Sequence, residues 1–277
     1  MSTSKIVSVN IMGGLGNQLF QIASAYAYAK KNNGILQIIH EINNGNRPVY
    51  WETLLKKIKP YLVSSIPPTL EQWREDFPTM YKDIGELSFS GKYLNGYLQS
   101  SKYFYNDEIK NEIKELFTQD KSLINEICNK YKYLIENKNR IVVIHARRTD
   151  YLTDFNKQFH GVQTSIYYTE AINKILQYVN NPIFLLSSDD NSYWNEIKED
   201  IHIVFNSEYF IIENESDINT FLLLQHFNNV IMSNSSFIWW TTWLSNASNV
   251  IAPSKWFGPI GPCLFNDIYE SHWHLIN

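Results

Sequence analysis

Short apolar runs alternate with predicted helices over the second half of the chain. Runs rich in Ile, Val, Leu and Phe fit strands that are buried on both faces of a sheet. These predicted strands lie at 141–144, 183–187, 201–205, 229–232 and 249–252. The predicted helices lie at 167–179, 192–200, 217–227 and 237–245, with Asp217 as the cap of the third. Such alternation is typical of a doubly wound parallel sheet.

The first half begins with a strand at 6–12, which leads through Gly13-Gly14-Leu15-Gly16 into helical spacing at 17–31. A strand, a glycine-rich turn and a helix form a common anion-binding start. The turn lacks the third glycine of GxGxxG and the GK[ST] of a Walker loop, so a purely structural turn is an equal reading. Further predictions are strands at 35–40 and 92–99 and helical structure at 107–138.

We place a domain boundary near residue 138. The predicted parts are an N-terminal lobe, 1–138, and a C-terminal lobe, 139–277, whose last helix can pack back on the first lobe. Three predicted strands of the second lobe end in polar groups: HARRTD at 145–150, SSDD at 187–190 and SNSS at 233–236. Parallel strands end at one edge of a sheet, and open α/β sheets bind ligands there. We therefore expect these three groups to converge.

Two adjacent arginines, Arg147 and Arg148, follow the strand at 141–144. A guanidinium pairs bidentately with phosphate or carboxylate, and cations beside a buried strand are costly without an anion. One interpretation is a phosphate clamp. The other is a pair of structural ion pairs with Asp150 or another carboxylate.

The remaining edge residues have several readings. Ser233 to Ser236 precede a helix and either bind an anion or serve as an ordinary N-cap. Asp189 and Asp190 either accept hydrogen bonds from a ribose or purine or bind a divalent metal, and a third reading is that Asp190 caps a helix. His145 is either an acid/base group or a structural hydrogen-bonding residue.

Composition narrows the class of protein. The 277 residues are 44% hydrophobic and 19% charged, which fits a folded globular protein. The formal net charge of −4 argues against a general nucleic-acid binder. Cys128 and Cys263 form no CxxC pattern, which indicates reduced thiols. Without a signal peptide or a window of ~20 apolar residues, we expect a cytoplasmic protein, with peripheral contact to the inner membrane left open.

Five motifs together resemble the bacterial alpha-1,2-fucosyltransferase family, glycosyltransferase family 11, over nearly the whole chain. They are GGLGNQLFQ at 13–21, GYLQSSKYF at 96–104, HARRTDY at 145–151, SSDD at 187–190 and SNSSFIWWTTWLS at 233–245. The resemblance implies a GT-B-like α/β fold with two Rossmann-like lobes, the donor site on the C-terminal lobe and the active site in the cleft between them. It also implies inverting transfer of L-fucose from GDP-β-L-fucose to the 2-hydroxyl of a galactoside, without metal or other cofactor. The family more often has Gly where this chain has Thr149.

The same resemblance implies roles for individual residues. Arg147 would bind the donor diphosphate, and Arg148 would support the loop or make a second phosphate contact. Asp189 would lie near the nucleoside. The implied donor-binding residues also include Asn234, Ser235, Ser236, Phe237, Gly14 and Gly16.

Asn17 would face the reacting sugar and the acceptor. Asp150 and His145 are the candidate general bases for the acceptor hydroxyl, although Asp150 could instead orient an arginine. The alternatives to this function are a fucosyltransferase of another linkage or acceptor, a non-catalytic GDP-sugar-binding protein, and a metal-dependent enzyme built on Asp189 and Asp190. The natural acceptor is expected to be an O-antigen or similar lipid-linked glycan.

Overall fold

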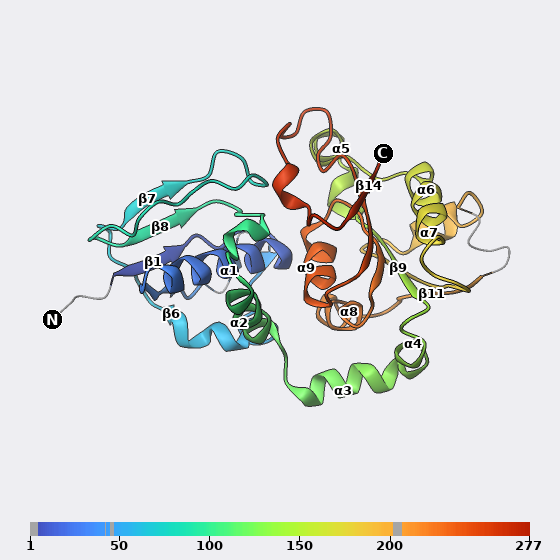
Figure 1. Ribbon diagram of the computed structural model, residues 1–277, viewed down its shortest axis with the longest axis horizontal. Coiled ribbons are helices and arrows are strands. Elements are labelled where there is room, and N and C mark those ends of the chain that lie inside the picture. The colour runs from blue at the N-terminus through green and yellow to red at the C-terminus, as the bar shows by residue number, and fades with distance from the viewer. Residues whose placement is uncertain (1–4, 42, 45–46, 202–206) are drawn as a thin grey trace. The chain divides into compact units, whose positions relative to one another are not determined.

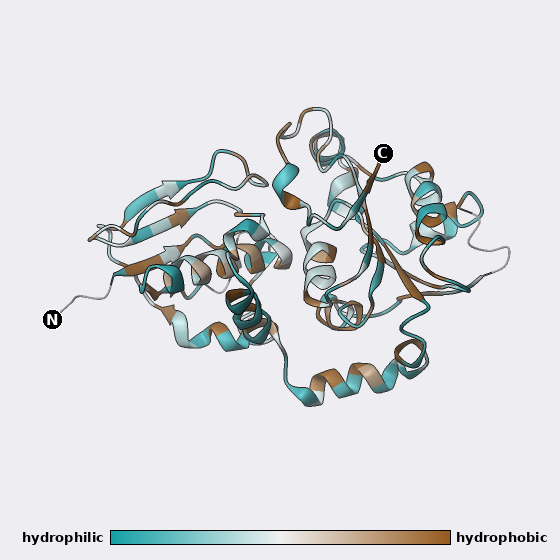
Figure 2. Ribbon diagram, viewed as in Figure 1, coloured by the Kyte–Doolittle hydropathy of each residue, from teal (hydrophilic) through white to brown (hydrophobic). Residues whose placement is uncertain are grey.

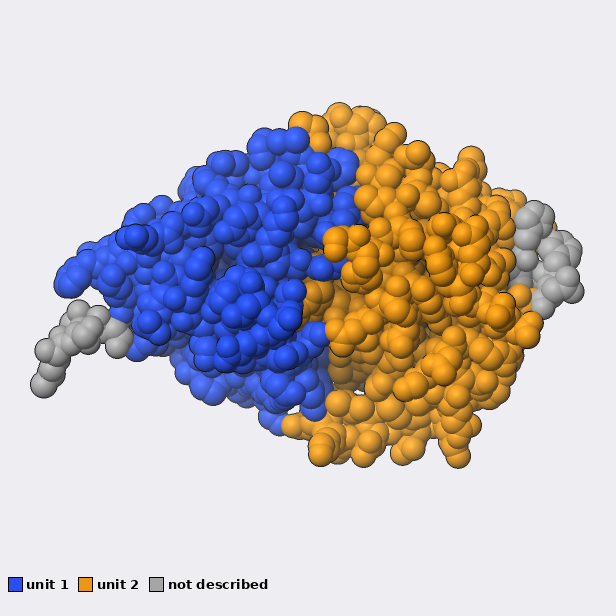
Figure 3. All heavy atoms as spheres, viewed as in Figure 1, with its two compact units in different colours: residues 1–119, 264–270 blue, residues 120–263, 271–277 orange. Residues whose placement is uncertain are grey.

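The computed structural model describes residues 5–41, 43–44, 47–201 and 207–277. These residues form two compact units (Figures 1 and 3). Unit 1 comprises Met1–Gln119 and Leu264–Glu270, and unit 2 comprises Asp120–Cys263 and Ser271–Asn277. The assignment of an acceptor lobe and a donor lobe, divided at residue 138, stays a prediction.

Unit 1 is built on a four-stranded parallel sheet with the order β2-β1-β8-β7. Its strands are β1 (Ile6–Val9), β2 (Ile35–Leu36), β7 (Glu71–Arg74) and β8 (Lys92–Asn95). Helix α1 (Leu15–Lys31) packs against β1 and β2 and is buried over most of its length. The predicted strand–turn–helix start is confirmed.

The predicted strand at 35–40 is wrong as one strand, because the backbone changes partners in its middle. The Gln37 N–H donates to the Val7 carbonyl at 2.9 Å, but the His40 N–H donates to the Val63 carbonyl at 2.9 Å. The second part, β3 (Ile38–Ile39), therefore pairs with β6 (Leu62–Val63) in a separate two-stranded sheet. The short strands β4 (Asn43–Asn44) and β5 (Arg47–Pro48) form another pair. Unit 1 also contains the 3₁₀ helices η1 (Lys56–Tyr61), before β6, and η2 (Ser101–Tyr103), after β8.

The helical prediction for 107–138 is confirmed as three helices: α2 (Asp107–Phe117), α3 (Lys121–Lys130) and α4 (Lys132–Glu136). Helix α2 buries Ile109, Ile113 and Phe117, which recur every four residues on one face. The Asn106 side chain caps this helix by accepting the Ile109 N–H at 2.8 Å.

Unit 2 contains a six-stranded parallel sheet with the order β11-β10-β9-β12-β13-β14. Its strands are β9 (Ile141–Ala146), β10 (Ile183–Ser188), β11 (Glu208–Ile211), β12 (Asn229–Ile231), β13 (Asn249–Pro253) and β14 (His274–Ile276). Every residue of β9 is buried, as the apolar run predicts, and Figure 2 shows the hydrophobic colour of the central strands. Of the predicted strand at 201–205, residues 202–205 lie outside the described residues.

Within the described part of this unit, five α-helices connect these strands: α5 (Asp154–His160), α6 (Ser165–Ile175), α7 (Ser192–Ile197), α8 (Asp217–Leu224) and α9 (Ser236–Leu244). The 3₁₀ helix η3 (Thr149–Leu152) follows β9, and the 3₁₀ helix η4 (Asn266–Ile268), which precedes β14 in the chain, belongs to unit 1. Asp217 is not the cap of α8, because the Ser216 hydroxyl accepts the Asn219 N–H at 3.1 Å and Asp217 is the first helical residue. Among the described residues, no helix is long and apolar enough to cross a membrane.

Candidate active site

The three polar groups converge at one edge of the unit 2 sheet, as predicted. Strand β9 pairs in parallel with β10 on one side and with β12 on the other. His145 lies opposite Ser187, and Ile144 lies opposite Ile231. The segments 147–150, 189–190 and 233–236 therefore leave the sheet next to one another.

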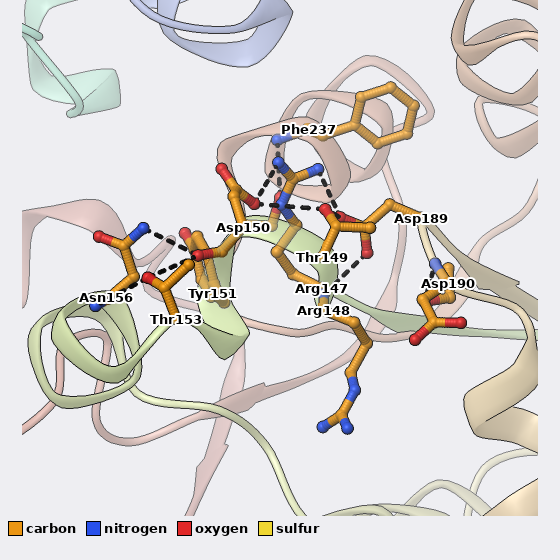
Figure 4. Close-up of polar contacts among 12 residues, drawn as sticks. Arg147, Arg148, Thr149, Asp150, Tyr151, Thr153, Asn156, Asp189, Asp190 and Phe237 are labelled. Carbon is orange, nitrogen blue, oxygen red and sulfur yellow. Dashed lines mark hydrogen bonds and ion pairs between the residues drawn. The ribbon is translucent and has the colours of Figure 1, made fainter.

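The Arg147 guanidinium lies between two carboxylates (Figure 4). Its Nη2 is 2.7 Å from Asp150 Oδ1, and its Nη1 is 3.0 Å from Asp189 Oδ2. The Arg147 side chain is 23% exposed and Asp189 is 21% exposed, so neither is fully withdrawn from solvent. Two carboxylates on two different N–H groups fix both the position and the plane of this cation.

Asp189 also holds the loop that carries Arg147. Its carboxylate accepts the Arg148 backbone N–H at 2.7 Å and the Thr149 hydroxyl. The family more often has glycine at the position of Thr149. Here the Thr149 side chain supplies a hydrogen bond, and its backbone does not have the positive φ that would favour glycine. The Asp150 carbonyl is bound in turn by the Asn156 side chain at 2.8 Å.

Arg148 points away from this cluster (Figure 4). Its guanidinium carbon lies 3.9 Å from the ring centroid of Tyr193 on α7, a cation–π contact. Its buried Nε has no hydrogen-bond partner among the described residues. The structure thus brings the Arg148 side chain against Tyr193, and Arg148 contacts Asp189 through its backbone N–H.

Asp190 is separate from Asp189. Its carboxylate accepts the Ser192 N–H at 3.2 Å and the Ser192 hydroxyl at 2.5 Å at the start of α7. This is the geometry of an Asx turn, and the N-cap of α7 is Asn191 without a side-chain cap, so the predicted cap role of Asp190 is wrong. Among the described residues, no group of three or more His, Cys, Asp or Glu side chains is arranged to hold a metal ion.

His145 lies beneath the loop and is only 5% exposed. Its Nδ1 is 2.9 Å from the Ser233 hydroxyl, and its ring stacks on Phe237 with the centroids 5.9 Å apart. The pKa of His145 is lowered to about 4; burial is the largest cause, Asp189 opposes the shift and Arg147 adds to it. His145 is therefore neutral at pH 7 and joins β9 to the segment after β12.

The SNSS segment is held by hydrogen bonds to other segments of unit 2. The Asn234 amide nitrogen donates to the carbonyls of His160 at 2.6 Å and Trp256 at 2.9 Å, and its oxygen accepts from Gln163. Ser235 is the N-cap of α9 and accepts the Phe237 N–H at 3.3 Å. The N-cap interpretation is thus confirmed for Ser235, and it is compatible with anion binding at the same helix end.

Sequence reasoning did not assign Tyr151, which ties two of the motifs together. Its hydroxyl donates to the Asn234 carbonyl at 3.2 Å, and its ring stacks on His160 with the centroids 4.4 Å apart. The Arg147 guanidinium carbon is 5.7 Å from the Tyr151 ring centroid. The position of Tyr151 inside the HARRTDY motif was the available signal.

The glycine-rich turn and Asn17 belong to unit 1 and are described within that unit. Gly13 has a φ of +78°, and a Cβ there would lie 2.4 Å from Asn17 Nδ2. The N-terminus of α1 follows at Gly14, which provides no side-chain cap. Asn17 Oδ1 accepts the Gln99 side-chain N–H at 2.6 Å.

Comparison with known proteins identifies the family. The sequence profile described as Glycosyl transferase family 11 matches residues 1–277. The chain belongs to glycosyltransferase family 11. This glycosyltransferase is 28% identical to an alpha-1,2-colitosyltransferase of Escherichia coli, over 91% of this chain and 92% of that one. It is also 28% identical to the O-antigen biosynthesis glycosyltransferase WbnK of E. coli, over 89% and 93% of the two chains. Galactoside alpha-(1,2)-fucosyltransferase 2 of Hylobates lar is 28% identical over 88% of this chain and 70% of its own.

Two solved structures with the same fold are fucosyltransferases. The NodZ alpha-1,6-fucosyltransferase soaked with GDP-fucose matches with a TM-score of 0.54 at 13% identity, over 91% of this chain and 96% of its own. NodZ from Bradyrhizobium matches with a TM-score of 0.52 at 12% identity, over 87% and 92% of the chains. The predicted GT-B-type α/β fold is confirmed.

Proposed function

We propose that the protein is a GDP-fucose-dependent galactoside α-1,2-fucosyltransferase. The observation that carries the proposal is the Arg147 guanidinium, held by Asp150 and Asp189 at the carboxyl edge of β9. The family membership and the α-1,2-transferases among the relatives supply the reaction class.

The reaction is a single displacement with inversion at the sugar. The bond between fucose C1 and the β-phosphate oxygen breaks as the acceptor 2-hydroxyl oxygen bonds to C1, and GDP leaves with the electron pair. Negative charge grows on the diphosphate as this bond breaks. A fixed guanidinium stabilises that charge more in the transition state than in the ground state, which raises the rate.

The acceptor proton has to move to a base, for which Asp150 and His145 are the candidates. One Asp150 oxygen is occupied by Arg147, and the His145 side chain is buried and bound to Ser233. Both contacts support positioning roles: Asp150 orients Arg147, and His145 connects two loops. The base therefore stays unassigned, and a non-protein route for the proton, such as water, is compatible with the chemistry.

The donor side of the proposal uses the helix α9 N-terminus and the loop after β10. The Ser235 and Ser236 region would contact the diphosphate or guanosine, with Phe237 and Asp189 nearby; Asn234 would act by fixing this loop. Gly14, Gly16 and Asn17 of unit 1 would face the sugar and the acceptor.

The place of the reaction is proposed to be the cytoplasm, supported by the free thiols Cys128 and Cys263. An O-antigen or similar lipid-linked galactoside as the natural acceptor is supported by the O-antigen glycosyltransferase among the relatives. Contact with the membrane that carries such an acceptor rests on the family resemblance alone.

The experiment is product formation from GDP-fucose with a panel of galactosides, including lactose, with and without EDTA. We expect product fucosylated at the galactose 2-hydroxyl, equal yield with EDTA, and a loss of about 10²–10³-fold or more in kcat for Arg147→Ala. Arg148→Ala is the matched control, because it removes the neighbouring cation that points the other way. GDP-fucose binding without turnover would instead indicate a non-catalytic binding protein, and EDTA sensitivity would indicate a metal-dependent enzyme.

A second donor is suggested by the E. coli alpha-1,2-colitosyltransferase. Colitose differs from fucose by the absence of the 3-hydroxyl. A site that hydrogen-bonds the 3-hydroxyl of fucose would discriminate against GDP-colitose by about 10⁴–10⁵-fold. A site that has room for the 3-hydroxyl but does not bond it would discriminate only weakly between the two donors. The ratio of kcat/KM for the two GDP-sugars decides between these donors.

A further inference from the structure

The carboxyl edge of the unit 1 sheet carries a second polar cluster that no role above explains. Glu75 directly follows β7, and Gly96 directly follows the neighbouring strand β8. The Glu75 carboxylate accepts two consecutive backbone N–H groups of the loop after β8: Tyr97 at 2.5 Å and Leu98 at 2.8 Å. A carboxylate that accepts two backbone N–H groups fixes a loop through charge-assisted hydrogen bonds.

The loop is held in a conformation that it would not adopt alone. Leu98 has a φ of +56°, which is unfavourable for an L residue with a branched side chain, and it is fully buried. Gly96 permits the close approach of the carboxylate, since a Cβ there would lie 2.5 Å from Glu75 Cδ. The predicted strand at 92–99 ends at Asn95 for this reason: Tyr97 and Leu98 donate to a side chain and not to a neighbouring strand.

The next residue connects this loop to Asn17. Gln99 is 8% exposed, its N–H donates to the Pro78 carbonyl at 2.8 Å, and its side-chain amide donates to Asn17 Oδ1 at 2.6 Å. With its oxygen bound by Gln99, the Asn17 amide presents its nitrogen beside Gly13. A hydrogen-bond donor is thereby aimed at the glycine-rich turn before α1.

From this geometry we infer that Glu75 is a positioning residue for the transferase reaction, which acts through the 97–98 backbone and Gln99 to orient the Asn17 amide. The inference rests on the proposed function, because it assigns Asn17 to the reacting sugar or acceptor. Glu75 itself touches no substrate in this account. Its carboxylate is partly buried, and burial raises its pKa while the Tyr97 and Leu98 N–H groups oppose that rise.

The test is a mutant cycle between Glu75 and Asn17. Glu75→Gln keeps the size of the side chain but presents an NH₂ group to one of two N–H donors. We expect kcat to fall about 10–100-fold, as small misplacements of a reacting group do. GDP affinity should not change, because the Arg147 cluster belongs to unit 2. Glu71→Gln, at the start of the strand that Glu75 follows, is the matched control, because the Glu71 side chain is 50% exposed and pairs with Lys92.

The decisive comparison is made in the Asn17→Ala background. If Glu75 acts through Asn17, Glu75→Gln lowers kcat there by no more than about twofold, since the two losses share one cause. An equal fold-loss in both backgrounds overturns the inference and leaves Glu75 as a general loop anchor. If Glu75→Gln does not fold, Gln99→Met breaks the same connection without touching the carboxylate, and the same comparison applies.

Failure of the proposed function is read separately from failure of this inference. A wild-type protein that transfers neither fucose nor colitose contradicts the function. The inference is then read from the NMR signal of the Asn17 side-chain amide, which the Asn17→Asp variant identifies. A shifted or broadened signal in Glu75→Gln supports the positioning role, and an unchanged signal overturns it.

Discussion

Arg147 and Arg148 are neighbours in the chain, yet their side chains have opposite environments. Arg147 lies between Asp150 and Asp189, and Arg148 stacks on Tyr193. The backbone of Arg148 is fixed by Asp189, which accepts its N–H at 2.7 Å. One carboxylate thus holds the first arginine by its side chain and the second by its backbone.

This division predicts that Arg148 stabilises the loop and does not contact phosphate. Arg148→Leu should lower the free energy of unfolding by about 1–2 kcal/mol, through loss of the cation–π contact, and change kcat only a few-fold. Urea unfolding and GDP titration measure the two effects. Tyr193→Leu is the matched variant, and the two losses should be less than additive because they remove the same contact.

A large loss of GDP affinity in Arg148→Leu, without a change in unfolding, would instead support the second phosphate contact that the sequence left open. The sequence could not decide between these readings. Both arginines follow the same buried strand, and only the direction of the backbone at the strand end determines which side chain meets the carboxylates.

At the scale of elements, the turn before α1 depends on two adjacent glycines that differ in what surrounds them. Gly13 has positive φ and lies against Asn17, but a Cβ at Gly14 would meet no atom within 4 Å. The two positions therefore form a matched pair for substitution by alanine.

Gly13→Ala should destabilise the protein and lower kcat together. Positive φ strains an L residue by roughly 1–2 kcal/mol, and the new Cβ would displace the Asn17 amide. Gly14→Ala should keep the melting temperature of the wild type. If this substitution affects catalysis, it should change the KM for donor or acceptor. Thermal unfolding and steady-state kinetics separate these effects; a stable Gly13→Ala variant with wild-type kcat would show that Asn17 tolerates displacement.

Most of the elements of unit 2 could be predicted because buried parallel strands have a strong apolar signal. The predicted strands at 141–144 and 183–187 agree with β9 and β10 within two residues. The segment at 35–40 misled because four of its six residues are apolar, whereas its two halves pair with different strands. Apolar content does not encode a change of partner.

The candidate site shows the same limit. The convergence of the three polar segments could be predicted from the parallel sheet, and the motifs HARRTDY and SSDD pointed to Arg147 and Asp189 as candidate site residues. The Glu75–Gln99–Asn17 connection could not be found from sequence, since residues 75 and 99 are brought together by strands β7 and β8, and β7 itself was not predicted.

At the scale of the whole molecule, a buried neutral histidine makes stability depend on pH. The pKa of His145 is about 4 in the folded protein, against an ordinary value near 6.5. Between these values the unfolded chain binds a proton that the folded chain does not. The free energy of unfolding is therefore not reduced by this group above pH 6.5. It falls as the pH drops from 6.5 toward 4, by up to about 1.4 kcal/mol per pH unit.

His145→Asn removes this titration and keeps a side chain that can bond the Ser233 hydroxyl. The variant should be less stable than the wild type at pH 7, because the stacking on Phe237 is lost, but its stability should fall less steeply between pH 6.5 and 4.5. Urea unfolding across this range measures both slopes, and their difference isolates His145 from His160 and His226, whose pKa values burial also lowers. The exposed His40, replaced by Gln, is the control. Equal slopes in His145→Asn and the wild type would contradict the prediction, because they would mean that His145 binds its proton equally well in the folded and the unfolded chain.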